Sequence, residues 1–315
     1  MIISKNRKKS SETNSLNDSG MGKKRKLREV LIRVWPILPA ILYLVGFQII
    51  VFIYLFSLSL SSETAGSFPD FSTFGQILTD RQFLEAFSNT TLFTIVGTPL
   101  ELIAGLVLAL LLYRSFFLRN VIRGFFLIPL ALPALVTAML VYVLFDYPGG
   151  HVNHLLLGNY PPFPQLLAHP VSWRASHVTA LGLSLFGKVW RDMPISMLIL
   201  LAGLNSIDPE LLDAAKTMGA SLRQQFFRII IPLIIPSISV VVLLRSVEMW
   251  KEFIFPFVLA GRYRFLGTLI DFYYNDTGNA HYAAAVAIIM VVCIVITTLV
   301  LHKLLDLLKR GTGAV

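Results

Sequence analysis

The chain has 315 residues, of which 55% are hydrophobic and only 14% charged, with a mean hydropathy of +0.70 and a net charge of +9. Soluble domains carry about 25% charged residues, so this composition excludes an ordinary soluble protein and indicates a polytopic membrane protein. The single cysteine, Cys293, excludes an intrachain disulfide.

The first 30 residues are polar, basic and rich in serine and asparagine. Such a composition cannot bury enough apolar surface to fold, so we expect residues 1–30 to form a basic tail, disordered up to about Lys23. A membrane domain is expected over residues 31–310.

Six apolar segments are each long enough to cross about 30 Å of hydrocarbon as a helix. They lie near residues 36–60, 88–112, 122–145, 178–203, 233–260 and 281–301. The first segment is too long for a cleavable signal peptide. The expected fold is therefore all-α, with six transmembrane helices.

The basic residues are distributed unevenly over the loops. With the N-terminus inside, nineteen lysines and arginines fall on the inner side and four, Arg81, Arg174, Arg262 and Arg264, on the outer side. Loops rich in lysine and arginine stay in the cytoplasm. The sequence therefore predicts a multi-pass protein with both termini cytoplasmic. It also favours a topology signal over nucleic-acid binding as the role of the basic tail.

Two stretches match part of a ligand-binding pattern, but each lacks residues that such a site requires. The outer loop 146–177 carries His151 and His154, but no carboxylate or cysteine cluster accompanies them, so no metal site is expected. Gly182–Lys188 matches the start of a phosphate-binding loop. Val189 then stands where a hydroxyl must hold magnesium, so we expect this chain to bind no ATP.

Eight charged residues fall inside the predicted spans, where each would cost about 2.5–3.5 kcal/mol if it faced lipid at a helix centre. They are Glu101, Lys188, Arg191, Asp192, Arg245, Glu248, Lys251 and Glu252. They must face a water-filled cavity, pair with one another or lie nearer the interface. Two hypotheses stay open, namely that they line a translocation pathway or that they tie helices together. Trp190 and Trp250 flank them and are candidates for solute stacking, although packing is favoured.

The segment IDPELLDAAKTMGASLRQQFFRIIIP, within a predicted cytoplasmic loop over 205–232, has strong helix signals. Asp208 is a good N-cap residue and Pro209 fits the first helical position. Gly219 can end this helix in the left-handed conformation, and Ser221 can cap a second short helix, bounded by Pro232. The two helices would form a knob below the membrane. An ordinary amphipathic surface helix is the alternative.

This segment resembles the EAA loop of ABC-importer permeases. In that family Glu-Ala-Ala is followed by three residues, Gly, nine residues, Ile, one residue and Leu-Pro. The matching positions here are Asp213, Ala214, Ala215, Gly219, Ile229, Ile231 and Pro232. Two positions depart from the pattern, because Asp213 replaces Glu and Ile231 replaces Leu.

The resemblance extends from about Trp35 to Leu305 and is greatest to the maltose-type carbohydrate permeases. It includes FLEAFSNTTLFTIVG in the second span, RGFFLIPLALPAL in the third, and VWRDMPISMLILLAGLNSIDPELLDAA from the fourth span into the loop. One stretch departs, LAGRYRFLGT over 259–268, because relatives often carry a Gly-Gly-Pro-like turn where this chain has Arg262 and Arg264.

The resemblance implies the type I ABC-importer permease fold and a subunit rather than a whole transporter. Its implied partners are a second permease subunit, two ATPase subunits that hold ATP and magnesium, and an extracytoplasmic solute-binding protein, all at a bacterial or archaeal plasma membrane. It further implies that Asp213, Ala214, Ala215 and Gly219, with Ile229 and Pro232, couple the chain to the ATPase.

The four basic and four acidic span charges balance, which favours an uncharged solute such as a sugar.

Three alternatives remain open. One is an ABC importer for another solute, such as a glycerol-phosphate ester. Another is a stand-alone secondary transporter, for which the sequence has no convincing internal repeat. The last is an intramembrane enzyme. Ser184 and His177 are present, but the chain has neither Gly-x-Ser-x-Gly nor His-Glu-x-x-His, so we expect no catalytic residues.

Overall fold

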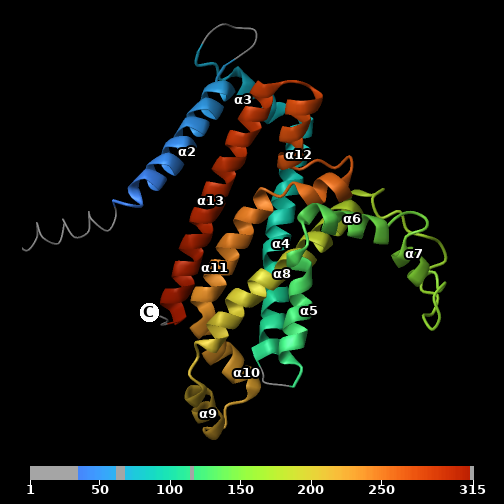
Figure 1. The fold of residues 1–315 in the computed structure, drawn as a ribbon, viewed down its shortest axis with the longest axis vertical. Coiled ribbons are helices and arrows are strands. Elements are labelled where there is room, and N and C mark those ends of the chain that lie inside the picture. Colours follow the sequence, from blue (N-terminus) through green and yellow to red (C-terminus); the bar gives the residue numbers. More distant parts are fainter. Residues whose placement is uncertain (1–34, 62–67, 114–116, 313–315) are drawn as a thin grey trace, which may run out of the picture. The chain divides into compact units, whose positions relative to one another are not determined.

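The structure, a computed structural model, describes residues 35–61, 68–113 and 117–312. Within these ranges the regular structure is entirely helical (Figure 1). The main helices are α2 (Leu38–Ser59), α3 (Ser72–Thr79), α4 (Arg81–Tyr113), α5 (Arg119–Ala131), α6 (Ala134–Leu144), α7 (His151–Leu156), α8 (His177–Asn205), α9 (Pro209–Thr217), α10 (Leu222–Gln225), α11 (Ile231–Trp250), α12 (Leu266–Asp271) and α13 (Ala280–Thr312). The predicted tail over residues 1–30 lies outside the described residues.

The chain divides into two compact units, residues 1–57 and residues 58–315. The first unit contains nearly all of α2, whose 22 mostly apolar residues would extend about 33 Å at 1.5 Å per residue. Its side chains are almost all exposed, as expected for a helix whose solvent is lipid. The remaining helices belong to the second unit.

The core of the second unit lies where α4, α8 and α11 pack together, and α13 runs alongside α11 (Figure 1). Leu112 of α4, Leu200 and Leu204 of α8, and Ile234 of α11 are fully buried in one cluster. Glycines let the backbones of α4 and α8 approach closely, as is common between membrane helices. At Gly105, for example, an added Cβ would lie only 2.6 Å from the Cβ of Ser196.

Four described helical segments are long and apolar enough to cross a membrane, and up to six if two bent pairs each count as one span. The four are Leu38–Ser59, Arg81–Tyr113, Leu222–Trp250 and Ala280–Arg310, and the bent pairs are α5–α6 and α8–α9. The all-α class is confirmed, and each of the six predicted spans corresponds to a helix or a helix pair.

The third predicted span is broken, which corrects the continuous helix predicted over 122–145. α5 and α6 meet at an angle of 97°. Leu132 between them is extended, with φ −80° and ψ 139°. Pro133 follows it, and a residue that precedes a proline avoids the helical region.

The fifth predicted span, 233–260, is wrong at its C-terminal end because α11 stops at Trp250. Residues 251–253 leave the helix, and a π-helical turn follows over Pro256–Ala260. Pro256 cannot donate to the carbonyl four residues earlier, and the Glu252 carboxylate accepts from the Phe255 backbone N–H at 3.2 Å. A new helical segment therefore starts within the range predicted as one continuous helix.

Gly105→Ala is expected to destabilise the α4–α8 contact, because the methyl group would meet Ser196 and, at 3.0 Å, the backbone nitrogen of Met197. Gly124→Ala on α5 is the matched control, since its Cβ would have no neighbour within 4 Å. Thermal unfolding in detergent should show a lower midpoint for the first variant only. An equal midpoint for both would mean that α4 and α8 can move apart freely.

Candidate functional site: a buried charge network and a cytoplasmic knob

Seven charged side chains from three helices and the break after α11 meet inside the protein. They are Glu101, Lys188, Arg191, Asp192, Arg245, Glu248 and Glu252. We call this set the charge network. Seven of the eight span charges singled out from the sequence thus belong to one network.

Lys188 forms the tightest contacts in the network. Its Nζ lies 2.6 Å from Oδ2 of Asp192, one turn along α8, and 2.8 Å from Oε2 of Glu252. All three residues are buried, and the other oxygen of Glu252 caps the helical segment at Phe255. Lys188 therefore fixes the broken end of α11 to α8.

Asp192 joins this group to Arg245 of α11. Its Oδ1 accepts from Arg191 Nη1 at 2.5 Å, and its Oδ2 lies 3.7 Å from Nη1 of Arg245. Arg245 also lies 2.8 Å from Glu248 and 3.5 Å from Glu101, and both Arg245 and Glu101 have no exposed side-chain surface. The Asp192 carboxylate thus links two cations of α8, Lys188 and Arg191, to Arg245 of α11.

Glu101 of α4 and Arg245 of α11 carry opposite charges but are incompletely hydrogen-bonded. Neither oxygen of Glu101 and none of the three guanidinium nitrogens of Arg245 has a hydrogen-bond partner of good geometry within the described residues. Unsatisfied buried polar atoms cost about 1–3 kcal/mol each. The Glu101–Arg245 contact is consequently easier to rearrange than the Lys188 contacts.

The three remaining pathway candidates lie elsewhere. Trp250 is buried and donates through Nε1 to Thr297 of α13 at 3.1 Å, so it packs between helices. Trp190 is half-buried on α8, and Lys251 is exposed just after α11. The structure therefore shows helix ties at the network and leaves the lining of a pathway as a hypothesis.

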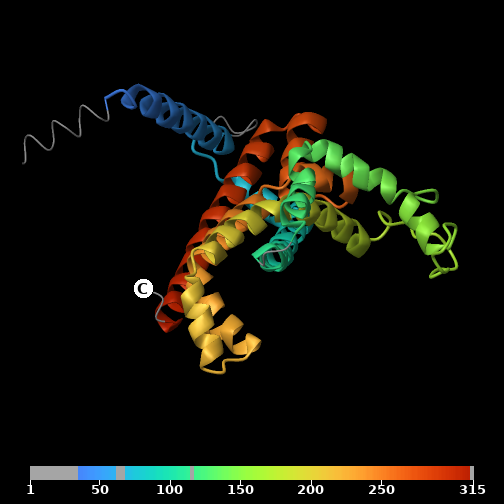
Figure 2. The same ribbon diagram turned by 60° about the horizontal axis from the view of Figure 1, so that its bottom comes forward.

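The segment over 205–232 forms the predicted knob, which projects beyond the ends of α8 and α11 (Figures 1 and 2). Asp208 caps α9 by accepting from the Glu210 backbone N–H at 3.0 Å, with Pro209 in the first turn. Gly219 ends α9 with φ +82°, and Ser221 starts α10 with a capping box that includes Gln224. The predicted caps are confirmed.

Pro232 does not end the second short helix, contrary to the prediction. The chain continues from α10 through a π-helical turn, Phe226–Ile230, directly into α11. The Ile231 N–H donates to the carbonyl of Phe226, five residues earlier. This wider turn accommodates the proline without breaking the helix, because carbonyls are displaced from the pyrrolidine ring. α10 and α11 are therefore mechanically continuous.

The residues of the knob that were predicted to contact the ATPase are exposed or half-buried. The Asp213 side chain is 72% exposed and pairs with Lys216 of the same helix at 2.9 Å. Ala214 is exposed, whereas Ala215, Ile229 and Pro232 are half-buried. Met218, Leu222 and Phe227 are also exposed. A carboxylate, small residues and apolar side chains are thus available together on one protruding element.

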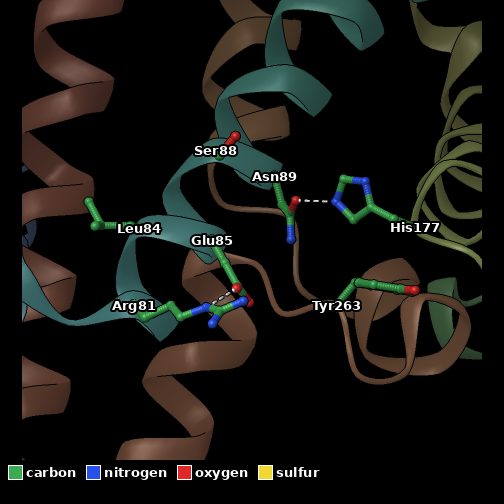
Figure 3. Close-up of a pocket in the computed structure, with 7 residues that line it drawn as sticks. All are labelled: Arg81, Leu84, Glu85, Ser88, Asn89, His177 and Tyr263. Carbon is green, nitrogen blue, oxygen red and sulfur yellow. Dashed lines mark hydrogen bonds and ion pairs between the residues drawn. The ribbon is translucent and has the colours of Figure 1, made fainter.

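A third feature is a cavity that the sequence did not predict. It has a volume of about 570 Å³ and lies at the N-terminal ends of α4 and α8 (Figure 3), lined by Arg81, Leu84, Glu85, Ser88, Asn89, His177 and Tyr263. Asn89 and His177 are 88 residues apart and hydrogen-bonded at 2.7 Å. No sequence spacing could indicate this contact.

No group of three or more potential metal ligands is present within the described ranges.

Lys188→Met is expected to lower the free energy of unfolding by about 3–5 kcal/mol, because Asp192 and Glu252 would lose a buried partner. Lys251→Met, one residue before Glu252 but exposed, should change it by less than about 1 kcal/mol. Denaturant titration in detergent measures both. If both variants changed the free energy of unfolding by less than about 1 kcal/mol, water would already solvate Lys188, Asp192 and Glu252.

Comparison with known proteins agrees with this architecture. Residues 101–310 match the family described as "Binding-protein-dependent transport system inner membrane component". The trehalose/maltose transport system permease protein MalF of Thermococcus litoralis is 29% identical over 91% of this chain and 97% of its own. The xylose/arabinose import permease protein XacH of Haloferax volcanii is 30% identical over 76% of this chain and 77% of its own.

A solved structure has the same fold. A chain of a bacterial ABC transporter involved in the import of the acidic polysaccharide alginate superposes with a TM-score of 0.76 at 19% identity, over 89% of this chain and 98% of that one. Fold, family match and sequence relatives agree over most of the length. The chain belongs to the family of inner-membrane components of binding-protein-dependent transport systems, and is a transport subunit rather than an enzyme.

Proposed function

We propose that this chain is the permease subunit of an ATP-driven importer whose solute is a neutral sugar or oligosaccharide. The observation that carries the proposal is its similarity, over 76% to 91% of its length, to permeases named for trehalose, maltose, xylose and arabinose. The charge network, with three basic and four acidic members, supports it, because a strongly anionic solute would favour an excess of basic residues along the path.

The proposed orientation places the knob in the cytoplasm. Described basic residues gather at the knob end of the second unit, at Arg119 and Arg123 of α5, Arg223 and Arg228 of the knob itself, and Lys309 and Arg310 of α13. This asymmetry supports cytoplasmic termini in a bacterial or archaeal plasma membrane. The cavity at Asn89 and His177 then opens toward the outside.

In this proposal the knob docks on an ATPase subunit, which holds the ATP and magnesium. Asp213 pairs with a basic group of the ATPase, while Ala214, Ala215 and the turn at Gly219 permit close approach. The exposed Met218 and Leu222 add apolar contact area. A second permease, a second ATPase and an extracytoplasmic binding protein complete the assembly.

The continuous helix from α10 into α11 gives the coupling a physical route. A displacement of the knob would move α11 and with it Arg245 and Glu248. The incompletely hydrogen-bonded Glu101–Arg245 contact is where α11 can change partners, while Lys188 keeps the segment after α11 on α8. ATP binding by the partner would thereby bias a two-state helix arrangement between inward and outward access.

Asp213→Lys should separate ATP hydrolysis from transport and weaken copurification with the ATPase by about tenfold or more. The new ammonium group would repel the basic group of the ATPase with which the Asp213 carboxylate is proposed to pair. Asp306→Lys is the control, since Asp306 also pairs with a lysine three residues later, Lys309, and is partly exposed. Full transport by the first variant would contradict the docking role of Asp213.

The solute is tested by reconstituting the chain with its ATPase, second permease and binding protein in proteoliposomes. Trehalose uptake should require ATP and stop when the ATPase is omitted, whereas alginate oligosaccharides, which are anionic, should not be taken up. Preference for the anionic oligosaccharide would contradict the neutral-sugar assignment while leaving the family intact.

A further inference from the structure

Two hollows follow one another along α4 and α8, from the outer end inward. The first is the cavity of about 570 Å³ with polar walls (Figure 3). The second, of about 160 Å³, has apolar walls that include Leu92 and Val96 of α4 and Val178 and Leu185 of α8. Farther along the same two helices lie Glu101 and Lys188 of the charge network.

His177, the first residue of α8, belongs to the walls of both hollows. Its Nε2 lies 2.7 Å from Oδ1 of Asn89, and its ring packs edge-on against Tyr263 at 5.0 Å between centroids. Asn89 is buried and donates through Nδ2 to the carbonyl of Arg264 at 2.8 Å. His177 is exposed, and these two contacts orient its imidazole where the polar hollow meets the apolar one.

One lining residue, Tyr263, belongs to residues 259–268, the stretch that departs from the family pattern. The chain turns at Gly261, which has φ +59°. Arg262 and the hydroxyl of Tyr263 both donate to the carbonyl of Ala175, each at 3.1 Å. The Arg264 guanidinium lies 3.8 Å from the centroid of the Phe272 ring. Arg262 therefore helps to hold Tyr263 beside the cavity, because the two side chains bind the same carbonyl and each other.

The lining has the chemistry of a site for a neutral, hydroxyl-rich molecule. Arg81 and Glu85 pair at 2.9 Å, so the two charges of the wall compensate each other. Ser88, Asn89 and His177 offer further donors and acceptors, and Tyr263 offers an aromatic face. Sugar rings combine hydroxyl edges with apolar CH faces, which polar groups and aromatic rings recognise together. The volume lies within the range of about 300–1,000 Å³ that is usual for ligand pockets.

We propose that this cavity is an outer binding site for a sugar on the permease itself, and that His177 controls passage from it into the apolar hollow. The proposal rests on the proposed function. The solute would meet the polar cavity first, exchange hydrogen bonds with the Asn89–His177 pair, and then enter the hollow bounded by Leu92 and Leu185.

The test uses the complete transporter in proteoliposomes with its binding protein and ATPase. In a Cys293→Ala background, Ser88→Cys places a thiol in the cavity and Gln82→Cys places one on the exposed surface of α4 outside it. After labelling with fluorescein maleimide, trehalose uptake should fall at least about tenfold for Ser88→Cys and stay within about twofold for Gln82→Cys, because only the first label fills the cavity.

Stimulation of ATP hydrolysis by the binding protein separates the outcomes. The proposal requires that labelled Ser88→Cys retain this stimulation while losing uptake. Loss of the stimulation would instead identify the cavity as a docking surface for the binding protein, and unchanged uptake after complete labelling would overturn the site. Absence of trehalose uptake before any labelling would count against the sugar assignment.

The role of His177 is tested by solute selection. His177→Gln keeps a donor for Asn89 and should preserve the ratio of maltotriose to trehalose uptake within about twofold, whereas His177→Ala should raise it at least about threefold by widening the passage. An equal loss of both sugars in His177→Ala would show that the side chain only supports the fold, and would overturn control of passage by His177.

Discussion

The arrangement of the second unit depends on how seven charges are kept away from lipid. Asp192 contacts Lys188, Arg191 and Arg245, and so links α8 to α11. Glu101 extends the network to α4, and Glu252 to the segment after α11. Charges that would each be costly in hydrocarbon instead stabilise one another in the protein interior. The same contacts set the relative positions of the helices that carry the proposed pathway.

Two irregular backbone segments determine how α11 is connected to the rest of the second unit. Membrane proteins tolerate non-helical segments only where protein or water satisfies the backbone. After Trp250 the helix stops, and Glu252 uses one oxygen for the Phe255 N–H and the other for Lys188. At the knob, the π-helical turn Phe226–Ile230 lets the chain pass Pro232 without a break. One irregularity thus fixes α11 to α8, and the other joins α11 to the knob.

α8 relates the three features of interest. Its 29 residues begin at His177 beside the outer cavity, pass Lys188 and Asp192 in the charge network, and end just before the knob. At 1.5 Å per residue this helix extends about 43 Å, which exceeds the hydrocarbon thickness of a bilayer. A single helix therefore connects the proposed solute site with the proposed ATPase site, and its contacts with α11 join it to the coupling route through α10 and α11.

The sequence by itself determined the helical class, the six apolar segments and the caps at Asp208, Gly219 and Ser221, because these depend on local hydrophobicity and backbone chemistry. It also singled out every member of the charge network. Only the tertiary structure decided which charges pair, that α11 ends at Trp250, and that Asn89, His177 and Tyr263 line one open cavity. Those features depend on contacts between residues far apart in the chain, and neither local composition nor periodicity carries information about which distant side chains the packing of helices brings together.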